Sequence, residues 1–183
     1  MAWSGILIYW AHQAYVILPK ILVDKLNLHH RLAEGMGWHF LVMWIFALNG
    51  LGYCLYLILS GDWRNIFPRK KDFQELLPFV LHDLKILKTG PDLREIYNPA
   101  QKMAYTSAIL MGAGLILTGA AIFKPVQLGW LTSLLGGYEA ARLEHFILLV
   151  AIFLFFIVHI LQVMRSGWNN FRAMVVGHEI EKE

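Results

Sequence analysis

Three histidines of this chain lie in long apolar stretches, where an imidazole ring is energetically costly. His39 stands near the start of "WHFLVMWIFALNG", and His145 and His159 enclose thirteen consecutive apolar residues. A polar ring inside a membrane span is by default a functional hypothesis. On one helix, the separation of 14 residues between His145 and His159 corresponds to about 21 Å of rise and keeps both rings within about 40° of the same face. This geometry favours two cofactors stacked across a bilayer.

Haem is the cofactor that fits this arrangement best. Neutral imidazole is a common axial ligand of haem iron, and the macrocycle requires an apolar slot. Zinc would require ligands around one point, whereas His145 and His159 are about 21 Å apart along a helix. When successive spans are antiparallel, the starts of the second and fourth spans lie at the same depth. His39 and His145 stand near these starts, which predicts that the two share one haem on the outer side. The alternative is that each histidine is hydrogen-bonded to a neighbouring helix.

Other residues near the predicted haem have two interpretations. Arg31 and Arg142 lie at the outer ends of spans, where they either bind haem propionates or anchor the membrane edge. Glycines in the two central spans either leave room for a flat ring or allow close helix packing; they are Gly50, Gly52, Gly112, Gly114 and Gly119. His12 is at the wrong depth to complete a site with His159. Four histidines outside the spans are interpreted as surface residues: His29, His30, His82 and His178.

The composition indicates that the histidines are held by a membrane protein. Of 183 residues, 57% are hydrophobic and 16% are charged, unlike a soluble domain of this size. Four stretches approach the roughly 20 residues that a span requires: residues 3–23, 35–59, 103–123 and 141–164. Helices satisfy their own backbone in lipid. We therefore predict an all-α membrane protein, with one domain over residues 1–183, that forms a four-helix transmembrane bundle with a short or truncated first span.

The basic residues are distributed unevenly between the two sides of these spans. Eight Lys and Arg residues lie in the loop 60–102 and three in the C-terminal tail, against five on the opposite side. The positive-inside rule then places this loop and the C-terminus in the cytoplasm. We predict a solvated loop with one amphipathic helix at residues 79–87, whose basic residues can meet anionic lipid headgroups. The net charge of +3 is accounted for by basic residues at the cytoplasmic membrane surface. It therefore does not indicate a nucleic acid as a partner.

Cysteine usage restricts the chemistry further. Cys54 is the single cysteine of the sequence. An intramolecular disulfide, a four-cysteine metal site and covalent attachment of haem through a CxxCH motif are therefore excluded.

Six segments between residues 31 and 177 resemble those of a known family. They are "GWHF", "YNPAQKMAY", "LILTG", "GGYEAARLEHF", "FIVHI" and "NNFRAMVVG". The chain resembles the cytochrome b membrane subunits of the thiosulfate reductase and formate dehydrogenase type. This resemblance implies four helices in the bacterial inner membrane, with His39 and His145 ligating an outer haem b and His159 ligating an inner one.

The first span departs from the family pattern. In the family, this span begins with a histidine and closes with a Ser/Thr-Gly pair, and "WSGILIYWA" is similar only to the closing part. Either translation starts upstream of Met1, which we favour, or the chain has lost half a span and the second ligand opposite His159. Two haems are thus expected by resemblance, of which one is fully ligated in this sequence.

The resemblance also implies a function in electron transfer. The expected ends of the path are the quinone pool and a periplasmic molybdopterin or iron-sulfur oxidoreductase subunit. Because two histidines per iron leave no coordination position for a substrate, no substrate-converting site beyond quinone or quinol is expected. Candidate quinone contacts are Tyr105, Gln162 and Arg165. Two alternatives stay open: a membrane anchor or assembly subunit with one haem or none, and a free-standing quinol-oxidising cytochrome.

Overall fold

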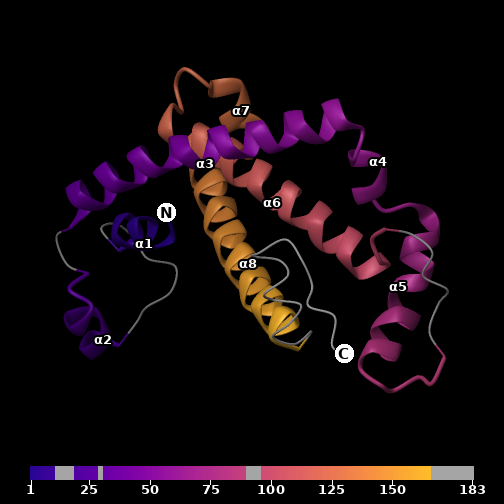
Figure 1. The fold of residues 1–183 in the computed structure, drawn as a ribbon. Coiled ribbons are helices and arrows are strands. Elements are labelled where there is room, and N and C mark those ends of the chain that lie inside the picture. Colours follow the sequence, from indigo (N-terminus) through magenta and orange to yellow (C-terminus); the bar gives the residue numbers. More distant parts are fainter. Residues whose placement is uncertain (11–18, 29–30, 90–95, 166–183) are drawn as a thin grey trace. The chain divides into compact units, whose positions relative to one another are not determined.

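The computed structural model describes residues 1–10, 19–28, 31–89 and 96–165, and the regular elements among them are all helices. In chain order these are α1 (Ala2–Tyr9), α2 (Lys20–Lys25), α3 (Leu32–Ser60), α4 (Trp63–Ile66), α5 (Lys70–Asp83), α6 (Pro99–Phe123), α7 (Gly129–Leu134) and α8 (Tyr138–Arg165). Figure 1 shows them coloured along the chain. The predicted all-α class is confirmed for this part of the chain.

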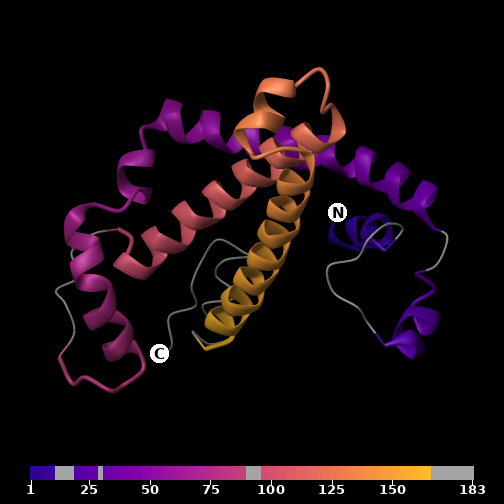
Figure 2. The ribbon, with the colours of Figure 1, turned by 180° about the vertical axis from the view of Figure 1, so that it is seen from behind.

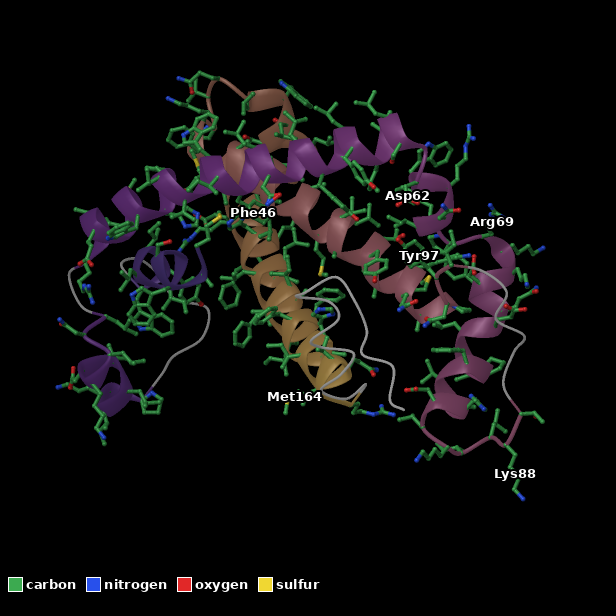
Figure 3. The ribbon with its side chains drawn as sticks, viewed as in Figure 1. Phe46, Asp62, Arg69, Lys88, Tyr97 and Met164 are labelled. Atoms are coloured by element: carbon green, nitrogen blue, oxygen red, sulfur yellow. The ribbon has the colours of Figure 1, made fainter. Side chains whose placement is uncertain are left out.

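Three helices are long and apolar enough to cross a membrane, namely α3, α6 and α8. They correspond to the predicted spans 35–59, 103–123 and 141–164, so the chain is an integral membrane protein. Their apolar side chains point outward, as Figure 3 shows for Met164 near the end of α8, which is 72% exposed. Such an apolar exterior suits lipid, where no polar face is needed.

The first predicted span, residues 3–23, coincides with α1, α2 and the segment 11–18 between them. That segment, with His12 in it, lies outside the described residues, as do residues 29–30, 90–95 and 166–183. The four-helix bundle therefore stays a prediction.

The chain divides into two compact units, Met1–Trp63 and Arg64–Glu183. In the first unit α1 packs on α3, beside a small core of Leu7, Val23 and Leu28. A Cβ added at Gly35 would lie 2.8 Å from the Leu7 Cβ and 3.1 Å from the Ser4 carbonyl oxygen. Glycine at this position therefore permits the close approach that brings α1 against α3.

In the second unit α6 packs on α8, with α7 against both. In both views α6 and α8 meet beside α7 and diverge toward their other ends (Figures 1 and 2). Asn98 begins α6 with a reciprocal cap, because its side chain accepts from the Gln101 N–H at 2.8 Å and its own N–H donates to the Gln101 side chain at 3.1 Å. Such pairs satisfy backbone donors that a helix start leaves open.

The loop 60–102 contains more helix than the sequence predicts. The predicted amphipathic helix at 79–87 is wrong in its bounds, since α5 runs from Lys70 to Asp83 and Lys85 takes a positive φ of 60°. Pro78 lies inside α5, where the proline removes one backbone hydrogen bond without ending the helix. The start of α5 is stabilised by Asp72, whose carboxylate accepts from the Arg69 N–H at 2.6 Å.

Two ion pairs hold α5 against the spans of its unit. Lys102 Nζ lies 2.9 Å from Asp72 Oδ1, and Arg165 Nη2 lies 3.2 Å from Asp83 Oδ2. Arg165 also donates to the Asp83 carbonyl oxygen at 3.1 Å. These contacts place α5, the start of α6 and the end of α8 at the same end of the second unit.

Candidate haem site

His145 is held by a hydroxyl group of the facing span. Its Nδ1 lies 2.9 Å from Thr118 Oγ1, and that hydroxyl donates to the Gly114 carbonyl oxygen at 2.7 Å. A threonine hydroxyl has one proton but two acceptor lone pairs. A hydroxyl that gives its proton to the carbonyl can accept only from an Nδ1–H of His145. In that arrangement the ring is in the tautomer whose Nε2 carries the lone pair.

A glycine next to Thr118 makes room for the same ring. A Cβ added at Gly119 would lie 3.3 Å from Cε1 of His145, closer than most real Cβ contacts. The half-buried imidazole thus rests against the backbone of α6. One turn farther along α8, Leu148 fills the space beside Gly114 in the same manner.

His39 has the same surroundings in the first unit. Its Nδ1 lies 3.2 Å from Ser4 Oγ, which donates to the Met1 carbonyl oxygen at 2.8 Å. The Met1 backbone is a second hydrogen-bond partner of the ring. If Ser4 Oγ accepts from an Nδ1–H, Nε2 again carries the lone pair. A Cβ added at Gly5 would lie 3.7 Å from Cε1 of His39, so a glycine also follows the hydroxyl residue here.

These two rings fit the requirements of an axial haem ligand. Imidazole binds iron through a nitrogen lone pair, and a hydrogen bond from the other ring nitrogen fixes the tautomer and the ring orientation. The Nδ1 contacts of His39 and His145 with hydroxyl groups are compatible with both features. Within the described parts of the chain, no three His, Cys, Asp or Glu side chains gather as a metal-ion site.

His159 differs from the other two histidines. It lies on α8 and its ring stacks on Phe155 of the same helix, with centroids 6.3 Å apart and planes at 10°. The side chain is exposed. An aromatic neighbour orients the ring without selecting a tautomer.

The two arginines predicted to bind propionates each contact a glutamate of their own helix region. Arg31 Nε donates to Glu34 Oε2 at 2.8 Å, and Arg142 Nη1 lies 3.5 Å from Glu139 Oε2. Neither contact tests a role in haem binding. Arg142 lies one turn before His145 on α8, so its position on the helix matches the predicted role.

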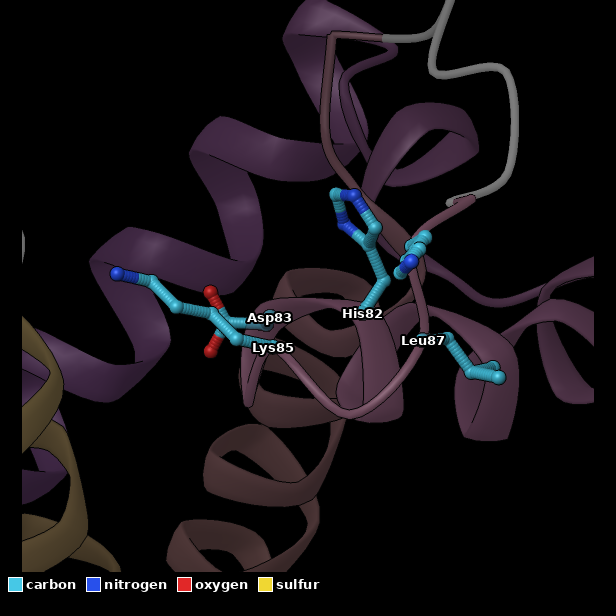
Figure 4. A pocket seen from close by; sticks show the side chains of 5 residues that line it. His82, Asp83, Lys85 and Leu87 are labelled. Carbon is cyan, nitrogen blue, oxygen red and sulfur yellow. The ribbon is translucent and has the colours of Figure 1, made fainter.

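The residues predicted to contact quinone have contacts in the second unit. Tyr105 packs edge-on against Tyr97 at 5.4 Å between ring centroids, Arg165 is paired with Asp83, and Gln162 is exposed on α8. A shallow open pocket occurs beyond the end of α5 (Figure 4), lined by His82, Asp83, Lys85, Leu87 and Lys88. The pocket therefore does not coincide with the predicted quinone contacts.

Sequence reasoning did not identify the hydroxyl partners of the histidines. The signal that could have found them is the Ser/Thr-Gly pair, which occurs as Ser4-Gly5 and as Thr118-Gly119. Both pairs were noted as points of resemblance, but neither was linked to His39 or His145.

Comparison with known proteins identifies the family of the chain. The family model described as prokaryotic cytochrome b561 matches residues 1–177. The chain is also 35% identical over 168 residues, covering 91% of this chain and 83% of the relative, to the "Putative protein-methionine-sulfoxide reductase subunit YedZ1" of Azospira oryzae. No solved structure matches the chain. The chain therefore belongs to the prokaryotic cytochrome b561 family, which confirms the predicted b-type cytochrome, its b-type haem and its place in membrane electron transport.

Proposed function

We propose that this protein is the membrane subunit of an oxidoreductase and carries electrons between the quinone pool and a periplasmic partner subunit. The observation that carries the proposal is the pair of matched contacts His39–Ser4 and His145–Thr118. Each contact involves Nδ1 of an imidazole on a helix long enough to cross a membrane, which supports Nε2 as the nitrogen that would bind iron.

We propose His39 and His145 as the two axial ligands of one haem b on the outer side. The support is the sequence: both residues stand near the starts of spans that run in the same direction through the membrane. Arg31 and Arg142, at the same helix ends, would bind the propionates. The haem, when bound, takes up and releases one electron. Because both axial positions are then filled by imidazole, the chain leaves no site for oxygen or substrate at the iron.

His159 is proposed as a ligand of a second, inner haem. α8 is continuous from Tyr138 to Arg165, so the 14 residues between His145 and His159 correspond to about 21 Å along one helix. The ring of His159 stacks on Phe155, and the second ligand of this site is unassigned. With this second haem, the proposed protein has the two haems of the thiosulfate reductase and formate dehydrogenase type.

The partner is proposed to be a periplasmic subunit that contains molybdopterin or an iron-sulfur centre. The relative from Azospira oryzae is named as a subunit of a reductase that acts on protein methionine sulfoxide, which supports a partner that carries the substrate chemistry. The eight basic residues of the loop 60–102 favour a cytoplasmic loop in the bacterial inner membrane. A C-terminus in the cytoplasm follows, and Tyr105, Gln162 and Arg165 would lie near the quinone on that side.

Haem quantitation in histidine variants tests this function. We expect His39→Ala and His145→Ala to lose the haem absorbance and the reduction of haem by quinol in membranes. The control is His82→Ala, an exposed histidine outside the candidate spans, which should keep both. Full haem content in His145→Ala would refute the proposed ligation. An assembled complex that transfers electrons normally with His39→Ala would instead favour the anchor role.

A further inference from the structure

The two compact units contain the same local arrangement around a histidine. In each unit a hydroxyl residue followed by glycine lies on one helix, and the histidine lies on the helix packed against it: Ser4-Gly5 with His39, and Thr118-Gly119 with His145. We propose that Ser4 and Thr118 are positioning residues that select the ligating tautomer of these histidines and lower the reduction potential of the iron they bind. This inference rests on the proposed ligation by His39 and His145.

The direction of each hydrogen bond follows from counting protons. Thr118 gives its hydroxyl proton to the Gly114 carbonyl oxygen at 2.7 Å, and Ser4 gives its proton to the Met1 carbonyl oxygen at 2.8 Å. Each hydroxyl is then an acceptor toward the ring. Because the carbonyl acceptors belong to the helix backbone, they keep each hydroxyl oriented. The Nδ1–H tautomer is thus selected by the protein itself.

The glycine of each pair restricts the ring at a second point. Cε1 of His145 lies where a Cβ at Gly119 would be only 3.3 Å away, and Cε1 of His39 lies 3.7 Å from the corresponding position at Gly5. A ring that is hydrogen-bonded at Nδ1 and rests against the backbone at Cε1 has little freedom to rotate. Nε2, on the far side of the ring from Nδ1, then has a defined direction.

A hydrogen bond from Nδ1–H also changes the ligand electronically. An acceptor at Nδ1 makes the imidazole a stronger base toward the metal. Stronger donation favours the ferric over the ferrous state, and second-shell hydrogen bonding is one of the ways in which proteins adjust haem potential. Removing the acceptor should therefore raise the reduction potential and weaken haem binding.

The test compares three variants of α6 in the full-length protein in membranes. Thr118→Val removes the acceptor while keeping the branched shape, and Thr118→Ser restores it. Thr106→Val is the matched control, because Thr106 Oγ1 donates at 3.3 Å to the Ile66 carbonyl oxygen. The readouts are haem content, the midpoint potential from a spectroelectrochemical titration, and the electron paramagnetic resonance spectrum of the ferric haem.

We expect Thr118→Val to weaken haem binding by about 10- to 100-fold and to raise the midpoint potential, while Thr118→Ser and Thr106→Val resemble the unmodified protein. A potential and spectrum for Thr118→Val equal to those of Thr106→Val would overturn the inference. Loss of haem in His145→Ala alongside an unchanged Thr118→Val would overturn this inference alone. Retention of haem in His145→Ala would overturn the proposed ligation as well.

The first unit supplies an independent comparison if Thr118→Val does not accumulate. Ser4→Ala removes the hydroxyl partner of His39 and leaves the Met1 backbone as a hydrogen-bond partner of the ring. Ser60→Ala is its control, since Ser60 Oγ donates to the Leu57 carbonyl oxygen at the end of α3. A raised potential in Ser4→Ala, with none in Ser60→Ala, supports the inference. Equal potentials in the two variants would contradict it.

Discussion

Asp72 and Lys102 form a buried ion pair that joins α5 to the first turn of α6. Lys102 Nζ lies 2.9 Å from Asp72 Oδ1, and the two residues are 3% and 2% exposed, respectively. The other carboxylate oxygen of Asp72 accepts from the Arg69 N–H at 2.6 Å. One carboxylate therefore stabilises the start of α5 and its attachment to a membrane span.

Asp72→Asn is expected to destabilise the second unit. The substitution removes the carboxylate partner of a buried ammonium, and breaking a buried pair on one side lowers the free energy of unfolding by about 3–5 kcal/mol. The matched control is Glu75→Gln in the same helix, whose pair with Lys71 is 3.7 Å long and exposed, and which should change stability by less than about 1 kcal/mol. Thermal unfolding in detergent measures both variants, and equal shifts would contradict the structural role.

The contribution of Asp72 should be insensitive to pH near neutrality and lost in acid. Burial raises the pKa of this carboxyl, but hydrogen bonds from the Arg69 N–H and Lys102, with the charges of Lys102 and Arg69, outweigh burial and hold the pKa below its usual range. The stabilisation is therefore complete above the unfolded pKa of about 3.9 and disappears as pH falls through the lower folded pKa. The difference in melting temperature between the unmodified protein and Asp72→Asn should be constant above about pH 5 and shrink below about pH 4. A difference that already shrinks between neutral pH and about pH 5 would contradict this expectation.

Gly35→Ala is expected to separate α1 from α3. Its Cβ would meet the Leu7 Cβ at 2.8 Å and backbone atoms of α1 at 3.1 and 3.2 Å, and none of these three atoms is the end of a flexible side chain. We expect a loss of about 1–3 kcal/mol and a change in the haem spectrum, because the Ser4–His39 hydrogen bond crosses the same contact. Gly37→Ala is the control, since its Cβ would meet nothing within 4 Å. Identical spectra and melting temperatures for the two variants would show that the contact is not required.

The 183-residue chain is expected to bind about one haem per polypeptide, a number that follows from complete ligation at one of its two proposed sites. His159→Ala should leave this ratio unchanged, because the proposed inner site has one assigned ligand, His159, and its second ligand is unassigned. Chemical haem quantitation against protein mass gives the ratio. A ratio near two that falls to one in His159→Ala would instead establish an inner haem in this chain.

Features that depend on residues close together in the sequence, such as apolar spans, were predictable from the sequence. The apolar runs at 35–59, 103–123 and 141–164 predicted three spans, and the structure has helices there that are long and apolar enough to cross a membrane. The histidines within these runs predicted a b-type cytochrome, which the family match confirms. The ligand roles of His39, His145 and His159 stay predictions.

The tertiary structure decided which side chains meet across the chain. Ser4 lies 35 residues from His39, Thr118 lies 27 residues from His145, and Asp72 lies 30 residues from Lys102. Such contacts depend on how one helix is rotated against another, which glycines such as Gly35 and Gly119 determine through the space they leave. The sequence pattern of a single helix does not specify this rotation. The sequence by itself determined that apolar helices place imidazoles in a membrane, and only the packing of those helices decided which hydroxyl group orients each ring.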